Sequence, residues 1–308
     1  MFPRTRVALL MLLAAGCGGG STTSAPRPAG GTWRSLSAMP AARQEVATAA
    51  LAGKVFVIGG FDSGGESSNS VFVYDPASDR WSTAAPLPIA NDHAGAAVAR
   101  GTLYALGGRS ARVFAYDAGR DAWREVAAMR FQHGGTPAVG VVGDRIYVAG
   151  GSGPMVGNEV ESYDPMTDRW TTLSSMRVPR NHCAGAFIAG KFYVAGGRPG
   201  PAAASALEAY DPQSDSWTSL SPMPTGRSGV AAGAVNGRLY VFGGEGATIF
   251  GDVEVFDPAV GSWTALAAMP TPRHGIFASV IGNGIYLPGG ALVPGFGATA
   301  VNEVFLVE

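Results

Sequence analysis

The 308-residue sequence predicts an all-β fold, a six-bladed β-propeller, and the regular placement of three kinds of residue supports this prediction. The six tryptophans of the chain recur at steps of 48, 42, 47, 47 and 46 residues. A Met or Leu follows each Trp six positions later, and a Gly pair follows 20 or 21 residues beyond that. Internal repeats of roughly 40 to 50 residues are typical of propellers, in which each repeat forms one blade. The tryptophans are Trp33, Trp81, Trp123, Trp170, Trp217 and Trp263, and the Gly pairs begin at Gly59, Gly107, Gly150, Gly196, Gly243 and Gly289.

Each repeat contains the same elements in the same order. The runs before the Gly pairs, such as 54–58 and 145–149, are short and rich in β-branched and aromatic residues, which suits strands buried between neighbouring blades. The Gly pair ends the run at a point where backbones crowd. An Asp-Pro turn then precedes the outer strand, on which the Trp packs between blades. All six tryptophans are therefore interpreted as framework residues.

Repeat five shows the fullest version of the pattern. It contains Asn236–Gly244 (NGRLYVFGG), Asp257-Pro258, Trp263 and Met269-Pro270. This pattern resembles the kelch repeat, and the resemblance covers residues 32–308. It implies a kelch β-propeller, a fold that serves as a protein docking module, as a sugar-binding protein and, more rarely, as an enzyme. The departures from the family pattern are the missing Pro after Asp117, Pro288 before the sixth Gly pair, and His133 where the family prefers Arg.

The two ends of the repeat array predict how the ring closes. Residues 302–308 align with residues 158–164, so the last blade lacks its outer strand at this end of the array. The segment around Trp33 carries an outer-strand Trp and supplies the missing strand. Pairing of the first strand with the last leaves no open sheet edge, and one domain over residues 32–308 follows.

The first 31 residues differ from the repeats. Arg4 and Arg6 precede an apolar stretch, residues 7–15, that is typical of a secretory signal peptide. The signal ends at Leu13-Ala14-Ala15-Gly16-Cys17, which resembles a bacterial lipobox and implies lipidation of Cys17. Residues 18–31 are rich in Gly, Ser, Thr and Pro and are expected to form a flexible tether. We expect a monomer in the bacterial cell envelope that contacts a membrane only through its lipid anchor; the alternative is an ordinary secreted or soluble periplasmic protein.

The charge balance excludes one large class of partner. The net charge is −1 and the isoelectric point is about 6.4. No basic run or stacking motif is present, so nucleic acid is not an expected partner.

Candidate site residues lie in the loops after the Gly pairs and in the segments after each Met-Pro. In kelch propellers these segments open on one face around the central pocket, and functional residues commonly occupy loops on a rigid scaffold. Arginines recur there, and because a guanidinium suits carboxylates, an acidic glycan or a carboxylate-bearing peptide is the expected ligand. The alternative is that the repeated Arg bonds backbone carbonyls and only supports the blade. The candidates are Arg43, Glu45, Asn91, His93, Arg109, His133, Arg180, His182, Arg198, Arg227, Glu245, Arg273 and His274.

No metal or other cofactor is expected from the sequence. All four histidines lie in these segments, but they come from different blades without a compact ligand spacing. Cys183 follows His182, and adjacent residues on a strand point to opposite faces. We therefore expect one pocket residue and one buried thiol rather than a nucleophile and its base.

Three classes of function fit the repeats. The first is a non-catalytic module of the cell envelope that presents its loop face to a protein or glycan, favoured because no nucleophile and base stand together. The second is an enzyme similar to the kelch mutarotases that act on sialic acid, with Arg180 or Arg198 holding the carboxylate and Glu45, Glu245 or a pocket histidine moving the proton. The third is a copper oxidase of the galactose oxidase type, which requires a Cys–Tyr thioether for which Cys183 has no apparent partner.

Overall fold

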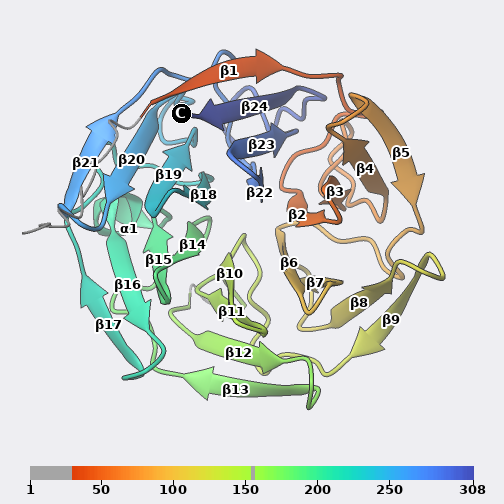
Figure 1. Ribbon diagram of the computed structural model, residues 1–308, viewed down its shortest axis with the longest axis horizontal. Coiled ribbons are helices and arrows are strands. Elements are labelled where there is room, and N and C mark those ends of the chain that lie inside the picture. The colour runs from red at the N-terminus through yellow and green to blue at the C-terminus, as the bar shows by residue number, and fades with distance from the viewer. Residues whose placement is uncertain (1–29, 154–156) are drawn as a thin grey trace, which may run out of the picture.

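The computed structural model describes residues 30–153 and 157–308, and these form a ring of six four-stranded antiparallel sheets (Figure 1). In each sheet, one edge strand lies near the axis and the other lies at the rim (Figure 1). The predicted all-β propeller of six blades is confirmed. The predicted signal peptide, the predicted lipidation site Cys17 and residues 18–29 of the predicted tether lie outside the described residues.

The blades are numbered in chain order, and one short helix, α1 (Gly200–Ser205), lies between two strands of blade four. The strands are β2 (Ala47–Leu51), β3 (Lys54–Ile58), β4 (Val71–Asp75) and β5 (Arg80–Ala84) in blade one; β6 (Ala94–Ala99), β7 (Thr102–Gly107), β8 (Val113–Asp117) and β9 (Ala122–Val126) in blade two; β10 (Ala138–Val142), β11 (Arg145–Ala149), β12 (Val160–Asp164) and β13 (Arg169–Leu173) in blade three; β14 (Ala184–Ile188), β15 (Lys191–Ala195), β16 (Leu207–Asp211) and β17 (Ser216–Ser219) in blade four; β18 (Ala231–Val235), β19 (Arg238–Phe242), β20 (Val253–Asp257) and β21 (Ser262–Ala265) in blade five; and β22 (Ser279–Ile281), β23 (Gly284–Pro288), β24 (Asn302–Val307) and β1 (Gly31–Ser35) in blade six.

The ring closes through β1, as the repeat alignment predicts. This strand pairs antiparallel with β24 (Figure 1), and Trp33 lies opposite Phe305 in the register. A Cβ on Gly31 would lie 2.5 Å from the Phe305 ring, so the strand can approach at this point only because residue 31 is glycine. Gly31, the last residue of the predicted tether, already belongs to the sheet.

Apolar side chains fill the spaces between neighbouring blades. One cluster joins blades one and two through residues such as Ile58 and Leu103, and five similar clusters join the other neighbours around the ring. The second strand of each blade is therefore mostly apolar on both faces, whereas the third strand of blades three to six also carries one buried glutamate. Cys183 is fully buried in the cluster between blades three and four, which confirms the expectation of a buried thiol. In the described part of the chain, no helix has the length and apolar character needed to cross a membrane.

The tryptophans also link the blades by hydrogen bonds. Each indole N–H donates to a backbone carbonyl of the preceding blade over 2.8–3.2 Å, as Trp123 does to Ala85. The backbone N–H of Ala85 in turn donates to the carboxylate of Asp121, which also accepts the hydroxyl of Tyr116. Asp79, Asp168 and Asp215 repeat this double contact in blades one, three and four.

These aspartates predict a loss of stability in acid. The hydrogen bonds from Ala85 and Tyr116 lower the pKa of Asp121 below its ordinary value, and equivalent bonds lower the pKa of the other three. A lowered folded-state pKa contributes stability that is present above the unfolded pKa of about 4 and is lost as the pH falls through the folded value. The melting temperature should therefore drop between about pH 5 and pH 2.

Blade five offers a matched variant for this test, because it carries Phe256 and Gly261 in place of the Tyr and Asp. Tyr116→Phe combined with Asp121→Gly should flatten the pH dependence of the melting temperature. Asp144→Asn, which changes an exposed carboxylate paired with Arg100, is the control. An unchanged acid transition in the double variant would contradict this role for Asp121.

Candidate functional site

The candidate site is built on a ring of six residues, one per blade, that surrounds the axis just before each inner strand. We call this set the hub ring. Six backbone hydrogen bonds of 2.7–3.1 Å link the blades around the axis at this level. Five of them join two residues of the hub ring; in blade three the N–H that donates to His93 belongs to Thr136, the residue after Gly135. All six residues have a left-handed backbone, with φ between 51° and 65°. They are Glu45, His93, Gly135, His182, Gly229 and Gly275.

Three members of the hub ring carry a side chain despite this backbone. The left-handed region costs an L-residue roughly 1–2 kcal/mol relative to glycine, and blades three, five and six accordingly have glycine. Gly275 is also needed for space, because a Cβ there would lie 2.6 Å from Oε1 of Glu45. Glu45, His93 and His182 occupy strained positions where glycine fits, and such outliers commonly mark functional sites.

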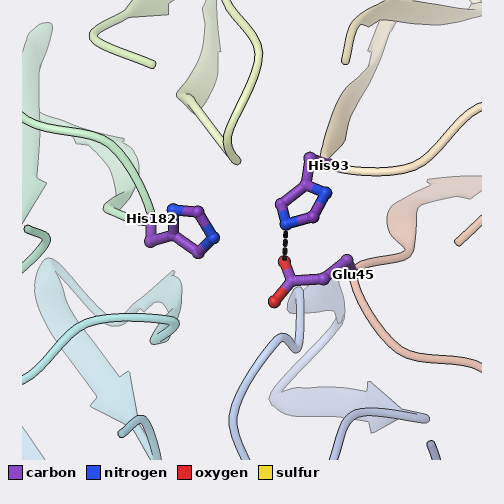
Figure 2. Close-up of side chains that lie close together, drawn as sticks. All are labelled: Glu45, His93 and His182. Carbon is purple, nitrogen blue, oxygen red and sulfur yellow. Dashed lines mark ion pairs between the residues drawn. The ribbon is translucent and has the colours of Figure 1, made fainter. Parts of the chain in front are cut away.

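The three side chains converge at the axis, as Figure 2 shows. One ligand atom from each can be chosen so that all lie within 4.8 Å of one another. Glu45 is 3 % exposed, and its Oε2 accepts the hydroxyl of Thr136 at 2.8 Å and lies 3.7 Å from Nε2 of His93 (Figure 2). The rings of His93 and His182 meet edge to face with centroids 5.0 Å apart.

The residue before each histidine fixes the orientation of its ring. Nδ1 of His93 lies 2.6 Å from Oδ1 of Asp92, and Nδ1 of His182 lies 2.9 Å from Oδ1 of Asn181. Both oxygens are acceptors, so each Nδ1 carries the proton in its hydrogen bond. The Nε2 atoms are therefore available for contacts with groups at the axis, such as Glu45 and Arg198.

The environment moves the two histidine pKa values in opposite directions. Burial alone would lower the pKa of His93, but the carboxylates of Glu45 and Asp92 outweigh burial and raise it. Burial lowers the pKa of His182 to about 3, and the guanidinium of Arg198 acts in the same direction. Burial opposes ionisation of Glu45, yet the three surrounding histidines hold its pKa below the ordinary value.

A hollow of about 520 Å³ opens above His93 and His182 on the loop face. Polar side chains and glycines line it, including Gln132, Ser152 and Asn181. Two arginines border it with exposed guanidinium groups: the side chain of Arg198 is 47 % exposed and that of Arg109 is 60 % exposed.

Hydrogen bonds hold Arg198 at the edge of the hollow. Its Nη2 lies 2.7 Å from Nε2 of His182, and its Nη1 lies 3.1 Å from Oε1 of Glu245. The other oxygen of Glu245 accepts the backbone N–H of Gly295 at 2.8 Å and lies 3.5 Å from Nε2 of His274. Arg109 is held more loosely, with Nη1 3.5 Å from Oδ2 of Asp92.

His274, the histidine next to Glu245, is 1 % exposed. Its Nε2 is 3.1 Å from the carbonyl oxygen of Val293, so Nε2 is the donor of that hydrogen bond. Its Nδ1 lies 3.9 Å from Oε1 of Glu45 and has no hydrogen-bond partner among the described residues.

The expectation that the repeated arginines surround the central pocket and bind the ligand is wrong for Arg180, Arg227 and Arg273. Their side chains are fully buried and pair within their own blades with Glu208, Glu254 and Glu303. Their guanidinium groups also donate to backbone carbonyls, as Arg227 does to Gly243 at 2.7 Å. Of the two roles that the sequence leaves open, these three arginines have the framework role.

The remaining blades use other residues at the same position. His133 lies 3.2 Å from Glu161 and 2.6 Å from the carbonyl oxygen of Gly150, so it replaces the arginine in blade three. In blades one and two the glutamate is replaced by Phe72 and Phe114. Arg43 stacks over the Phe72 ring at 5.4 Å, and Asn91 donates to the carbonyl of Gly107 at 3.0 Å. Six of the thirteen candidates thus support blades.

The other seven candidates lie in or next to the hub ring. The sequence analysis named all seven but did not predict that three of them meet at the axis. Glu45, His93 and His182 hold equivalent positions in three repeats, and the other three repeats have glycine at this position. That contrast is visible in the repeat alignment and could have indicated their special role. The seven are Glu45, His93, Arg109, His182, Arg198, Glu245 and His274.

Comparison with known proteins decides the family. The model of the Attractin/LZTR1 β-propeller family matches residues 29–254. The chain belongs to this family of kelch-repeat propellers. It is 32 % identical over 100 residues to Kelch-like protein 35 of Mus musculus, which covers 32 % of this chain and 17 % of the mouse protein. It is 32 % identical over 167 residues to Kelch-like protein terF of Aspergillus terreus, which covers 48 % of this chain and 36 % of that protein.

The kelch propeller thus spans well under two thirds of either curated relative. A solved structure titled "Structure of YjhT" superposes with a TM-score of 0.75 at 18 % identity, over 89 % of this chain and 99 % of that one. At this identity the likeness shows the fold alone. A kelch propeller supports a binding module in general, and the ligand must be argued from the residues of the hub.

Proposed function

We propose that this kelch propeller is a binding module whose hub hollow holds a carboxylate-bearing sugar unit of an acidic glycan. The observation that carries the proposal is the placement of Arg198 and Arg109. Both guanidinium groups are partly exposed at the hollow, whereas those of Arg180, Arg227 and Arg273 are buried. Arg198 is also held in position by two side chains, so little side-chain freedom is lost when it binds a carboxylate.

The lining of the hollow favours a sugar over a peptide. Glycines and polar or charged residues line the hollow, and Ser152, Gln132 and Asn181 among them supply hydrogen-bond donors and acceptors for hydroxyl groups. Among the residues that the structure describes, the lining contains no large aliphatic side chain that could anchor an apolar peptide residue. A volume of about 520 Å³ is within the range of ordinary small-ligand pockets.

Binding measurements on acidic glycan and acidic peptide arrays test this proposal. Arg198→Gln combined with Arg109→Gln should weaken binding of the acidic glycan by about 2–3 kcal/mol, because charge-assisted hydrogen bonds are lost. Arg120→Gln, which changes an exposed arginine in a hairpin turn of blade two, should leave binding unchanged. Equal binding by the double variant and the wild type would show that the arginines do not hold the ligand. If the protein bound only acidic peptides on the arrays, the ligand would be a peptide and not a sugar.

One observation favours a second candidate function, anomerisation of a bound sugar. The carboxylate of Glu245 lies against Arg198, so a proton acceptor stands beside the proposed carboxylate anchor. Turnover in a sugar anomerisation assay that Glu245→Gln abolishes would make the chain an enzyme similar to the kelch mutarotases. Binding without turnover would leave it a module.

The cellular location stays a prediction from the sequence. Lipidation of Cys17 would place the kelch propeller on a membrane surface at the end of a tether, where it could meet glycans of the cell envelope. Support for this location comes only from residues 1–31.

A further inference from the structure

We propose that the axis of the kelch propeller binds one divalent transition-metal ion through Glu45, His93 and His182. The ligand atoms come from blades one, two and four and already lie within 4.8 Å of one another. Nitrogen and oxygen ligands on a common ion, at metal distances of roughly 2.0–2.2 Å, lie about 3–4 Å apart. Small side-chain movements therefore complete the set.

The surroundings of the two histidines match those of metal ligands. In metal sites the ring nitrogen that does not bind the ion usually donates to a carboxylate or carbonyl, which fixes the ring and its tautomer. Here Nδ1 of His93 donates to Oδ1 of Asp92, and Nδ1 of His182 donates to Oδ1 of Asn181. Each Nε2 then carries the lone pair that an ion requires.

The buried negative charge of Glu45 also favours a cation at the axis. Its carboxylate is buried, and within residues 30–153 and 157–308 no Lys or Arg nitrogen lies within 4.0 Å of it. An isolated buried carboxylate is costly unless a cation or hydrogen bonds compensate it. Thr136 supplies one hydrogen bond to Oε2, and Nε2 of His93 lies 3.7 Å from the same oxygen and would exchange its own proton for the ion. The buried Nδ1 of His274 faces the other oxygen without a hydrogen-bond partner among the described residues. A bound cation would compensate the carboxylate.

The ligand types select the class of ion. Two imidazoles and one carboxylate suit zinc, cobalt, nickel or iron in the divalent state. Magnesium and calcium prefer all-oxygen sites. The three ligands leave coordination positions open toward the hollow.

Arg198 competes with the ion for one ligand atom. Its Nη2 lies 2.7 Å from Nε2 of His182, the atom that the ion would use. The ion must displace this contact, while the contact between Nη1 and Glu245 can persist. Metal binding would therefore free one edge of the Arg198 guanidinium toward the hollow.

Titration of the untagged, chelator-treated full chain with Zn²⁺, followed by calorimetry, tests the proposal. The wild type should bind one zinc ion per chain and bind Mg²⁺ far more weakly. Glu45→Gly, His93→Gly and His182→Gly should each weaken zinc binding by at least about 100-fold. Glycine is chosen because it occupies the hub ring in blades three, five and six, so the thermal transition of each variant should remain cooperative.

His133→Arg is the matched control. It removes a histidine outside the hub and installs the residue that blades four to six use at this position, so zinc binding should not change. Arg198→Gln should tighten zinc binding while it weakens glycan binding, which separates failure of this inference from failure of the proposed function. The inference would be overturned if the folded wild type did not bind zinc, or if all three glycine variants bound zinc as tightly as the wild type.

Discussion

Deletion of residues 31–35 should leave the chain unable to form soluble, folded protein. The deletion removes β1 and exposes the unpaired edge of β24, a site for aggregation in a protein that otherwise has its sheets arranged in a closed ring. It also removes Trp33, which packs on Phe305 with ring centroids 5.1 Å apart and donates to the carbonyl of Ala267 in blade five. The measurements are soluble yield and the cooperativity of thermal unfolding.

Two further variants distinguish loss of the strand from incidental damage. Trp33→Ala keeps the strand but removes its main apolar contact. Because Trp33 is only partly buried, the change should destabilise the fold by less than the ~3–5 kcal/mol typical of a buried Trp. Thr32→Ser with Arg34→Lys changes only exposed positions of β1 and should have little effect. A deletion variant that melts like the wild type would contradict closure by β1.

Arg180→Asn should destabilise the fold by about 3–5 kcal/mol, because it leaves Glu208 buried without its charged partner. Both side chains are essentially inaccessible, and the arginine also donates to the carbonyl of Val194. Arg198→Asn, at the exposed edge of the hollow, should change stability much less. Chemical denaturation of the three proteins gives the comparison.

Blade two supplies the rescue for this experiment. Its equivalent positions carry Asn91 and Phe114, a pair without charges. Arg180→Asn combined with Glu208→Phe should therefore recover most of the lost stability, since no buried charge remains. If the single variant were as stable as the wild type, or the double variant no more stable than the single, the ion pair would not have the structural role assigned to it.

The fold could be predicted from the sequence because a propeller repeats its contacts. The constant spacing of Trp, Met or Leu and the Gly pair fixes one blade, and the ring follows from six copies. Closure was also predictable, because residues 302–308 align with a third strand and Trp33 carries the signature of a fourth. Both inferences need only the order of elements along the chain.

The site was harder to predict because it depends on where long side chains end. Arg180 and Arg198 are both arginines in segments expected on the loop face, yet one is buried and the other half-exposed. The sequence did contain a signal: in blades three to six, which are four of the five repeats with His or Arg four positions after the Met, a glutamate stands two positions before the aligned Tyr or Phe. These glutamates are Glu161, Glu208, Glu254 and Glu303.

The expectation of no metal site relied on ligand spacing along the chain. That criterion suits short loops and hairpins, where ligands lie close in sequence. In a closed ring, equivalent positions of different blades meet at the axis whatever their separation. His93 and His182 lie in different blades, and their rings are 5.0 Å apart.

We propose that Arg109 and Arg198 hold the carboxylate of the ligand in the hub hollow. Modification of arginines by phenylglyoxal, read by peptide mass spectrometry with and without the acidic glycan selected on the array, tests it most directly. Without ligand, Arg109 and Arg198 should react while the buried Arg180 does not. Saturating glycan should protect Arg109 and Arg198 but not the exposed Arg120. Unchanged reactivity of Arg109 and Arg198 in the presence of bound glycan would contradict the claim.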